Sequence, residues 1–392
     1  MKTANLFLVV ILLATAGCGG GGGNKQSTDD LIIVDVTKSY PKKELILQDF
    51  MDVEYILLET TDETITQGVL QAVGKDIIIV KNAINDGNIF IFDRTGKGLR
   101  KINRKGQGGE EYSNILTMIL DEDNAEMFVN NSSTKKILVY DLYGNFKRSF
   151  KYKNELIRHD FIFQYDLDYL IAHESTLYVE GVFENERNTQ SFYLISKQDG
   201  KIDQEIEIPY KKGKYPWLMD GSTGAMRGSI YFPMIKYNDN WILISSSSDT
   251  VFRYLPDYSL VPFIVRTPSI QSMDPETFLF PSILTDRYYF MESIQKDYNL
   301  ATSGFPSKNL MYDKQEKTIY EYTVYNDDFT DRTVNMSSRC MNDEIIAFYE
   351  RLEAFQLVEA YKKGQLKGRL KDIAATLDEE DNPVIMLVKH RK

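Results

Sequence analysis

One pattern recurs along the chain and limits its fold more than any other feature. An apolar strand is followed by a turn containing Asp or Gly, and then by a second strand. The clearest copies begin at 88–96 and 136–144, and looser copies begin at 191–200 and 310–318. Such turns need a residue with positive φ or an Asp side chain that bonds the backbone. The pattern therefore predicts repeated β-hairpins.

The spacing of these hairpins indicates how they are arranged. The turn glycines Gly96, Gly144 and Gly200 follow one another at intervals of 48 and 56 residues. Hairpins that recur about every 50 residues are typical of four-stranded propeller blades. The 348 residues from Leu45 onward hold roughly six such units. We therefore predict an all-β fold, a six-bladed β-propeller of four-stranded antiparallel blades. A β-sandwich is the alternative, but it does not require one recurring turn type.

A propeller also needs a seam where its first and last blades meet. Pairing strands from both chain ends in one sheet closes the ring and removes an exposed sheet edge. Apolar strand patterns at 44–47, 55–58 and 384–388 mark the segments expected at this seam. Between about residues 345 and 377, the apolar residues follow helical spacing instead. We expect a short helical insertion there, in the last blade, covering one face of the disc.

The first 30 residues have the pattern of an export signal with a lipid attachment site. Lys2 precedes an apolar or small run at 6–16, which is too short to span a bilayer but suits a signal peptide. Small residues directly before Cys18 resemble a bacterial lipobox, whose Cys is acylated. A buried N-terminal helix is the alternative, although the glycines at 19–23 would leave it unsupported. We therefore predict three parts: a signal peptide over 1–17, a lipidated Cys18 with a flexible tether over 18–30, and a propeller over 31–392.

Composition argues against several classes of function. The chain has 46 Lys and Arg against 57 Asp and Glu, a net charge of −11, so it has no global basic field for nucleic acid. Three His and two Cys are too few for a multi-His or multi-Cys metal site. His159, His173 and His390 form no ligand motif, and the acidic runs at 121–123 and 378–381 lack EF-hand spacing. We expect no metal, no cofactor and no nucleic-acid partner.

Five segments are similar to one known family. They are residues 55–60, 89–93, 104–112, 248–253 and 380–384. Together they resemble the six-bladed β-propeller lipoproteins of Gram-negative gut bacteria, a family similar to NHL-repeat propellers. The resemblance extends over most of the chain. It implies the propeller architecture and a location in the cell envelope, and it implies no established reaction.

The loop at 104–112 is the first candidate for a ligand site. It lies between the outer strand of one hairpin and the first strand of the next, which in a propeller is near the central channel. Its glycines could present backbone N–H groups to an anion, with nearby basic side chains adding charge. The alternative is that the glycines only permit a tight crossing and that the tyrosine packs beneath it. The candidate ligand-binding residues are Arg104, Lys105, Gln107 and Tyr112.

Two aromatic groups are further candidates for ligand binding. Tyr215 and Trp217 follow a basic run, and Arg287 and Tyr288 begin a strand. Flat rings with a polar tip suit stacking on sugar rings or gripping a peptide. The alternative is packing within or between blades, which uses most of the aromatic residues of a propeller.

These observations favour a binding protein over an enzyme. The sequence has no G-x-S-x-G motif, and Cys340 lies among polar residues without a nearby His. Gly19 rather than Asp follows Cys18, which resembles lipoproteins sent to the outer membrane, so we expect a lipoprotein of that membrane, facing either the periplasm or the cell surface. It would bind a glycan, a peptide or an envelope protein partner as an accessory to nutrient uptake. The alternative is an envelope hydrolase or lyase at the channel mouth, since carboxylates from different blades can meet there.

Overall fold

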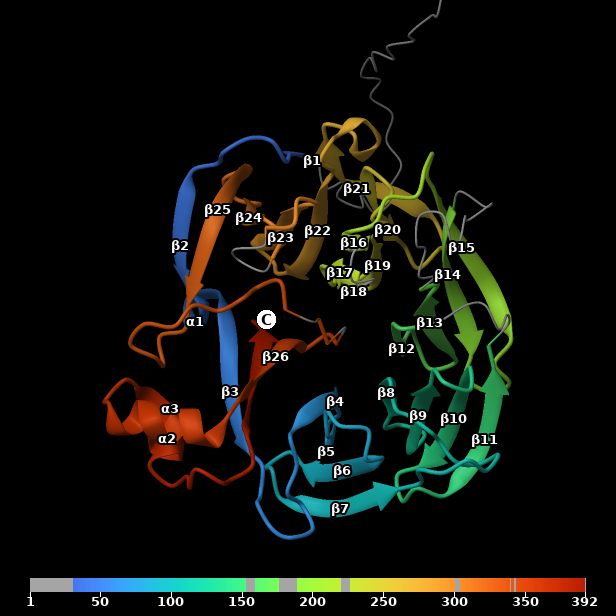
Figure 1. Ribbon diagram of the computed structural model, residues 1–392, viewed down its shortest axis with the longest axis vertical. Helices are drawn as coiled ribbons and strands as arrows, with labels where there is room; N and C mark the ends of the chain where they lie inside the picture. The colour runs from blue at the N-terminus through green and yellow to red at the C-terminus, as the bar shows by residue number, and fades with distance from the viewer. Residues whose placement is uncertain are drawn as a thin grey trace, which may run out of the picture. The chain divides into compact units, whose positions relative to one another are not determined.

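Six β-sheets stand around a common axis in the computed structural model, which confirms the predicted six-bladed propeller (Figure 1). The structure describes residues 31–152, 159–175, 189–219, 226–299, 304–338, 340–341 and 343–391. The predicted signal peptide, Cys18 and tether lie outside the described residues, so they remain predictions. Among the described residues, no helix has the length and apolar character that crossing a membrane requires.

Blades one to three are antiparallel meanders of four consecutive strands. Blade one holds β4 (Val69–Val73), β5 (Ile77–Lys81), β6 (Asn88–Asp93) and β7 (Gly98–Asn103). Blade two holds β8 (Thr117–Asp121), β9 (Glu126–Asn131), β10 (Lys136–Asp141) and β11 (Phe146–Lys151). Blade three holds β12 (Ile162–Gln164), β13 (Tyr169–His173), β14 (Thr189–Ser196) and β15 (Ile202–Pro209). The first three predicted hairpins are the two outer strands of these blades.

Blades four and five each contain an antiparallel meander of four consecutive strands. Blade four holds β18 (Met234–Tyr237), β19 (Asn240–Leu243), β20 (Thr250–Tyr254) and β21 (Leu260–Thr267). Blade five holds β22 (Thr277–Leu284), β23 (Tyr288–Gln295), β24 (Ser307–Asp313) and β25 (Thr318–Tyr325). A small extra sheet, β16 (Trp217–Met219) and β17 (Met226–Gly228), precedes blade four, and a 3-10 turn, η1 (Ile270–Ser272), precedes blade five.

Blade six closes the ring as predicted. Its described strands are β26 (Ile346–Leu352), β27 (Val384–His390) and β3 (Met51–Leu57). β3 and β27 are antiparallel, with Leu57 opposite Val384 and Met51 opposite His390. On the inner side of the same sheet, Cys340 forms an isolated bridge with Phe348. Strands from the two ends of the propeller therefore share one blade.

The N-terminal segment also covers the outer edges of two other blades, which the sequence did not predict. β1 (Ile32–Asp35) adds a fifth, parallel strand to β21, and β2 (Lys42–Ile46) adds one to β25. A short helix, α1 (Leu47–Phe50), then leads into β3. The predicted role of residues 44–47 in the seam is therefore wrong. An edge strand has the same apolar pattern whichever blade it joins, so the pattern does not identify the strand with which it pairs.

The hairpin turns use the predicted chemistry. Asp93 Oδ1 accepts hydrogen bonds from two backbone N–H groups, at 2.8 and 3.0 Å. Gly96 and Gly144 have φ values of 90° and 83°, which side chains other than glycine rarely adopt. A Cβ atom at Gly144 would lie 2.6 Å from Ile102 Cγ2 of the preceding blade. The glycine therefore also allows adjacent blades to pack closely.

The hydrophobic core is divided among the interfaces between blades. In one cluster, Phe128 and Val139 of blade two pack with Leu170 and Tyr193 of blade three. Other clusters join blade one to blade two, blade six to blade one, and blade three to blade four. Burial of apolar side chains at these interfaces stabilises the ring, since each blade alone would expose two apolar faces.

The helical insertion lies in the last blade, as predicted. α2 (Ala354–Lys362) and α3 (Gly368–Ala374) occur between β26 and β27. Buried residues such as Leu357 and Leu370 join them to the apolar cluster of that blade. Figure 1 places both helices beside β3, at the rim, rather than over the centre of the ring. The expectation that they cover one face of the disc is therefore wrong.

The topology gives the ring two distinct faces. A meander with an even number of antiparallel strands returns the chain to the end at which it entered. All connections from one blade to the next therefore lie on one side, which we call the crossing face. The turns between the first and second strands of each blade lie on the other side, which we call the turn face.

Candidate functional site

A polar pocket of about 390 Å³ opens between the β16–β17 sheet and blade five, and we call it the crossing-face pocket. Arg227, Gly228 and Ser229 come from β17 and the residue after it. Glu292 and Ile294 come from β23. Tyr298, Gly304 and Phe305 come from the connection between β23 and β24, and Ser307 begins β24. The pocket is within the range of 300–1,000 Å³ in which small ligands bind.

One end of the pocket is held by an arginine and a tyrosine. Arg227 Nη1 donates a hydrogen bond of 2.9 Å to Tyr298 Oη. The guanidinium also lies over the Tyr298 ring, with its Cζ 4.7 Å from the ring centroid. Phe305 meets the same ring edge to face, with centroids 5.4 Å apart. These contacts fix the position of a positive charge at the wall of the pocket.

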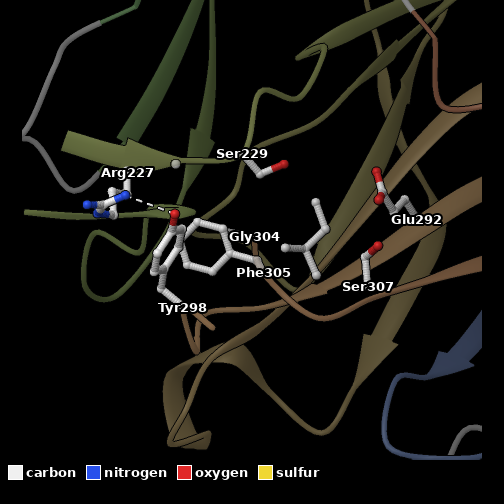
Figure 2. A pocket seen from close by; sticks show the side chains of 9 residues that line it. Arg227, Ser229, Glu292, Tyr298, Gly304, Phe305 and Ser307 are labelled. Carbon is white, nitrogen blue, oxygen red and sulfur yellow. Dashed lines mark hydrogen bonds between the residues drawn. The ribbon is translucent and has the colours of Figure 1, made fainter. Parts of the chain in front are cut away.

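Glu292 lies at the other end of the pocket, apart from Arg227 (Figure 2). Its partial burial raises the pKa of the carboxyl group above its usual value, although a hydrogen bond with Ser307 acts in the opposite direction. Ser307 and Ser229 add hydroxyl groups to the lining. The pocket therefore has opposite charges at its two ends and polar hydroxyl groups along its walls.

The predicted aromatic pair lies next to this pocket. The rings of Tyr215 and Trp217 are stacked, with centroids 4.7 Å apart and planes inclined by 19°. Trp217 is paired directly with Gly228 across the β16–β17 sheet. A Cβ atom at Gly228 would lie 2.7 Å from Trp217 Cβ, so this position accommodates the tryptophan because it is glycine. Trp217 is thus the strand neighbour of Gly228, a residue that lines the crossing-face pocket, while neither ring is itself among the residues that line it.

The loop at 104–112 crosses from β7 to β8 on the same face of the ring. Tyr112 has no exposed surface, and its hydroxyl donates to Gly87 O at 2.7 Å. The Gly108 N–H donates to Glu111 Oε2 at 2.8 Å. The loop's own carboxylate therefore occupies the position where we expected an anion. The packing alternative accounts for Tyr112.

The basic side chains of this loop also contact the protein itself. Arg104 Nε donates a hydrogen bond of 2.8 Å to Gly144 O in the next blade. Lys105 Nζ donates to Asn85 O. Gln107 is exposed. A ligand role for these three residues stays a prediction, and the structure does not bring them into the crossing-face pocket.

Arg287 and Tyr288 lie on the turn face, away from the other candidates. Arg287 Nη2 lies 3.0 Å from Asp313 Oδ2, in an ion cluster that also includes Lys43 of β2. Tyr288 is only 5% exposed, and Phe50 packs against its ring with centroids 5.3 Å apart. The contacts of both residues join the N-terminal segment to blade five. Their ligand role also stays a prediction.

A second pocket, of about 670 Å³, opens on the turn face. Asp286, Arg287, Asp343 and His390 line it, from blades five and six. Burial lowers the pKa of His390 below its usual value, although the two aspartates act to raise it. We call this the turn-face pocket.

Sequence reasoning missed the charged residues of the crossing-face pocket because they come from separate sheets. Arg227 and Glu292 are 65 residues apart and line one pocket only because the β16–β17 sheet lies against blade five. One local signal was available for Glu292, since it interrupts the apolar run of β23. No group of three or more His, Cys, Asp or Glu side chains among the described residues is arranged to hold a metal ion.

These features define a six-bladed β-propeller with polar pockets on both faces. The family described as Domain of unknown function (DUF4934) matches residues 31–389, so the chain belongs to this family. Among curated proteins, none matches the chain.

A solved structure has a similar fold. The chain is similar to a protein from Bacteroides fragilis that is named as a candidate exported protein, with 15% identity and a TM-score of 0.59. That match covers 92% of this chain and 100% of the other. A DUF4221 family member from Bacteroides vulgatus matches with 9% identity and a TM-score of 0.46, covering 88% and 98% of the two chains. Virginiamycin B lyase from Staphylococcus aureus matches with 11% identity and a TM-score of 0.31, covering 69% and 98%. The likeness to the first of these, at 15% identity, shows the fold alone.

Proposed function

We propose that this protein is a lipid-anchored β-propeller of the cell envelope that binds a small polar ligand, a glycan or a short peptide, in the crossing-face pocket. The observation that carries the proposal is that Trp217, stacked on Tyr215, is the strand neighbour of Gly228, which lines a pocket with charged ends. Cys18 directly follows the predicted signal peptide, and its lipid would anchor the protein in the outer membrane. Binding at the envelope would make the protein an accessory to nutrient uptake, alone or with an envelope protein partner.

The chemistry of the pocket supports binding more than catalysis. Small-ligand sites combine apolar or aromatic walls with a few polar groups that fix orientation. Phe305 and Ile294 supply such walls, while Arg227 and Glu292 supply the polar groups. Among the described residues, one carboxyl group lines this pocket, whereas glycoside cleavage by the usual mechanism needs two facing each other.

A ligand screen tests this proposal. Residues 31–392 would be applied to a glycan and peptide array, and each retained compound titrated by calorimetry. We expect Trp217→Ala to weaken binding about tenfold, the loss of one stacking surface, without changing the melting temperature. Tyr143→Ala is the matched control, because Tyr143 is an aromatic residue 71% exposed in a turn of blade two. Equal affinity of the Trp217→Ala variant for every retained compound would contradict the proposal.

The turn-face pocket supports a second candidate, an envelope hydrolase or lyase. Its specific support is the group of His390, Asp286 and Asp343 in one cavity. Because burial lowers the pKa of His390, the imidazole is neutral at pH 7 and suited to act as a general base. If this candidate is correct, a compound from the array should be turned over, and His390→Gln should slow turnover at least 100-fold. If the wild-type protein and the His390→Gln variant both bind the compound without turning it over, the enzyme candidate is excluded.

A further inference from the structure

A third cavity, of about 710 Å³, lies beside helix α2 at the rim of the ring, and we call it the rim pocket. Val358 of α2 and Leu377, which follows α3, line it and are 7% and 8% exposed. Ile65, from the connection between β3 and β4, also lines it and is 58% exposed. The rim pocket shares no lining residue with the crossing-face pocket or the turn-face pocket.

Hydrogen bonds hold the walls of the rim pocket in place. Asn382, which is 1% exposed, directly follows the acidic run 378–381. Its Nδ2 donates to two backbone carbonyl groups of residues 59–66, at 2.8 and 3.0 Å, and its Oδ1 accepts from the Thr66 N–H at 2.8 Å. The loop that carries Ile65 is therefore tied to the segment that carries the acids. Binding in a pocket with fixed walls costs little conformational entropy.

The rim pocket leaves apolar surface in contact with water. Phe355 precedes Val358 by about one turn of α2, so the two residues lie on the same side of that helix. Phe355 is 52% exposed, and Ile65 is exposed to a similar extent. An apolar side chain that enters the pocket would remove such surface from water, which favours association.

The lining of the rim pocket is also acidic. It includes four acids and one basic residue, namely Asp378, Glu379, Glu380, Asp381 and Lys362. Lys362 Nζ lies 2.9 Å from Glu379 Oε1, and among the described residues no basic side chain pairs with the other three acids. Lysine or arginine on a partner would complement this charge. A second copy bound through the same surface would instead bring two acidic linings together, which is unfavourable.

We infer that the rim pocket binds a segment of a partner protein in which a large apolar side chain is flanked by lysine or arginine. The apolar side chain would fill the pocket against Val358 and Leu377, and the basic side chains would face Asp378 and Glu380. The rim pocket is separate from the proposed ligand site, so the two proposals are tested independently.

A random peptide library identifies the chemistry that the rim pocket prefers. Twelve-residue peptides displayed on phage would be selected on the full chain in zwitterionic nanodiscs, after empty nanodiscs have removed the lipid binders. We expect the selected peptides to be enriched in Lys or Arg on either side of Phe, Leu or Trp. The peptide retained most strongly would be titrated by fluorescence anisotropy. Replacing its apolar residue by alanine should weaken binding at least about tenfold, because this removes the side chain that fills the pocket.

Ile65→Lys tests the apolar wall of the pocket. The substitution puts a positive charge where the partner is expected to be positive, so peptide affinity should fall at least about tenfold. Ile84→Lys is the matched control, because Ile84 is a loop residue 62% exposed in blade one and adds the same charge outside the rim pocket. The control should bind the peptide as the wild-type protein does. Since both positions are exposed, neither variant should change the melting temperature.

The double variant Asp378→Asn/Glu380→Gln tests the acidic lining. Affinity should fall about fivefold in about 50 mM salt and by less in about 500 mM salt, because these acids are exposed and their charges are screened. Asp203→Asn/Glu207→Gln removes two exposed acids from blade three and should leave affinity unchanged.

Three outcomes would overturn the inference. They are that no peptide is selected, that the selected peptides lack basic residues, or that every selected peptide binds the Ile65→Lys variant as well as the wild-type protein. Self-association in sedimentation velocity that Ile65→Lys abolishes would also overturn it, and would assign the rim pocket to a second copy of the chain. None of these outcomes affects the proposed ligand site, which Trp217→Ala tests on its own.

Discussion

Lys43 Nζ lies 2.9 Å from Asp313 Oδ2, although the two residues are 270 positions apart. Lys43 belongs to β2, the parallel strand added to the outside of blade five, and the Asp313 side chain has no exposed surface. Arg287 completes the cluster from the neighbouring turn. This contact joins the N-terminal segment to blade five before the chain reaches the seam of blade six.

Asp313→Asn tests whether this cluster stabilises the ring. Removing the charge leaves Lys43 and Arg287 with the more exposed Glu316 as their remaining shared carboxylate among the described residues, and weakening a buried ion cluster in this way costs at most about 3 kcal/mol. The free energy of unfolding, measured in urea, should fall by up to that amount. Asp199→Asn is the control, because its ion pair with Lys201 is largely exposed and should contribute far less. If both substitutions lower the free energy of unfolding equally, the buried cluster does not stabilise the ring more than an exposed ion pair does.

The same cluster should make stability depend on acid pH. Burial alone would raise the pKa of Asp313, but hydrogen bonds from Arg287 and Lys43 lower it from 3.8 to about 2. As the pH falls, the unfolded chain therefore binds this proton before the folded chain does. The stability from Asp313 is complete above about pH 4 and is lost between pH 4 and pH 2. Unfolding of Asp313→Asn should depend less steeply on pH across that window.

A second pH effect should come from two histidines of blade three. His159 and His173 are 1% and 6% exposed, and burial lowers their pKa values to about 4 and about 3. His159 packs between the rings of Tyr152 and Tyr193. The folded protein thus holds both imidazoles neutral at pH values where the unfolded chain protonates them. Their contribution to stability is complete above pH 6.5 and falls as the pH decreases toward 4.

His159→Phe is the variant that measures this effect. Phenylalanine keeps a ring between the two tyrosines but cannot be protonated. Between pH 7 and pH 4.5, the wild-type protein should lose about 2 kcal/mol more stability than the variant does. Urea unfolding at several pH values gives both slopes. Parallel slopes for the two proteins would show that His159 does not titrate on unfolding.

Gly228→Ala tests whether the position of Trp217 affects ligand binding in the crossing-face pocket. The added methyl group would lie 2.7 Å from Trp217 Cβ, so the tryptophan must move. In a Trp241→Phe background, where Trp217 is the remaining tryptophan, its fluorescence emission should shift. Ligand affinity should fall by a similar factor to that of Trp217→Ala. If neither the emission spectrum nor the ligand affinity changes, Gly228 does not contribute to the binding site.

The buried ion pair between Lys197 and Asp121 allows a test of the interface between blades two and three. The two side chains are 5% and 1% exposed and lie 2.8 Å apart. Lys197→Met alone should destabilise the protein by about 3–5 kcal/mol, because Asp121 loses its counter-ion. Adding Asp121→Leu should recover part of that loss. A double variant no more stable than the single one would show that the charges themselves are required.

The parts of the fold that the sequence predicted depend on local chemistry. Asp93 and Gly96 form a turn through bonds within a few residues, so their spacing revealed the hairpins and the number of blades. The apolar run at 384–388 revealed the closing strand for the same reason. The pairing of β1 and β2 with blades four and five was not predicted, because their partner strands are more than 200 residues away and their own patterns do not identify a partner.

The candidate site was predicted in part. Trp217 was singled out because an aromatic group outside the strand pattern is conspicuous; its strand neighbour Gly228 lines the crossing-face pocket, and its ligand role stays a prediction. Arg227 and Glu292 were not predicted, since they line one pocket only once the β16–β17 sheet and blade five pack together. The hydroxyl of Tyr112 donates a buried hydrogen bond to Gly87 O in the turn before β6, a contact that its local pattern did not predict.

Hydrogen–deuterium exchange with a retained ligand tests the central claim most directly. With ligand bound at the crossing-face pocket, peptides covering 226–229 and 304–307 should exchange more slowly than in the free protein. Peptides covering 236–239, 285–287 and 343–345, which border the turn-face pocket, should exchange at an unchanged rate. Protection of the turn-face peptides without protection at 226–229 would place the ligand on the other face of the ring and contradict the proposed site.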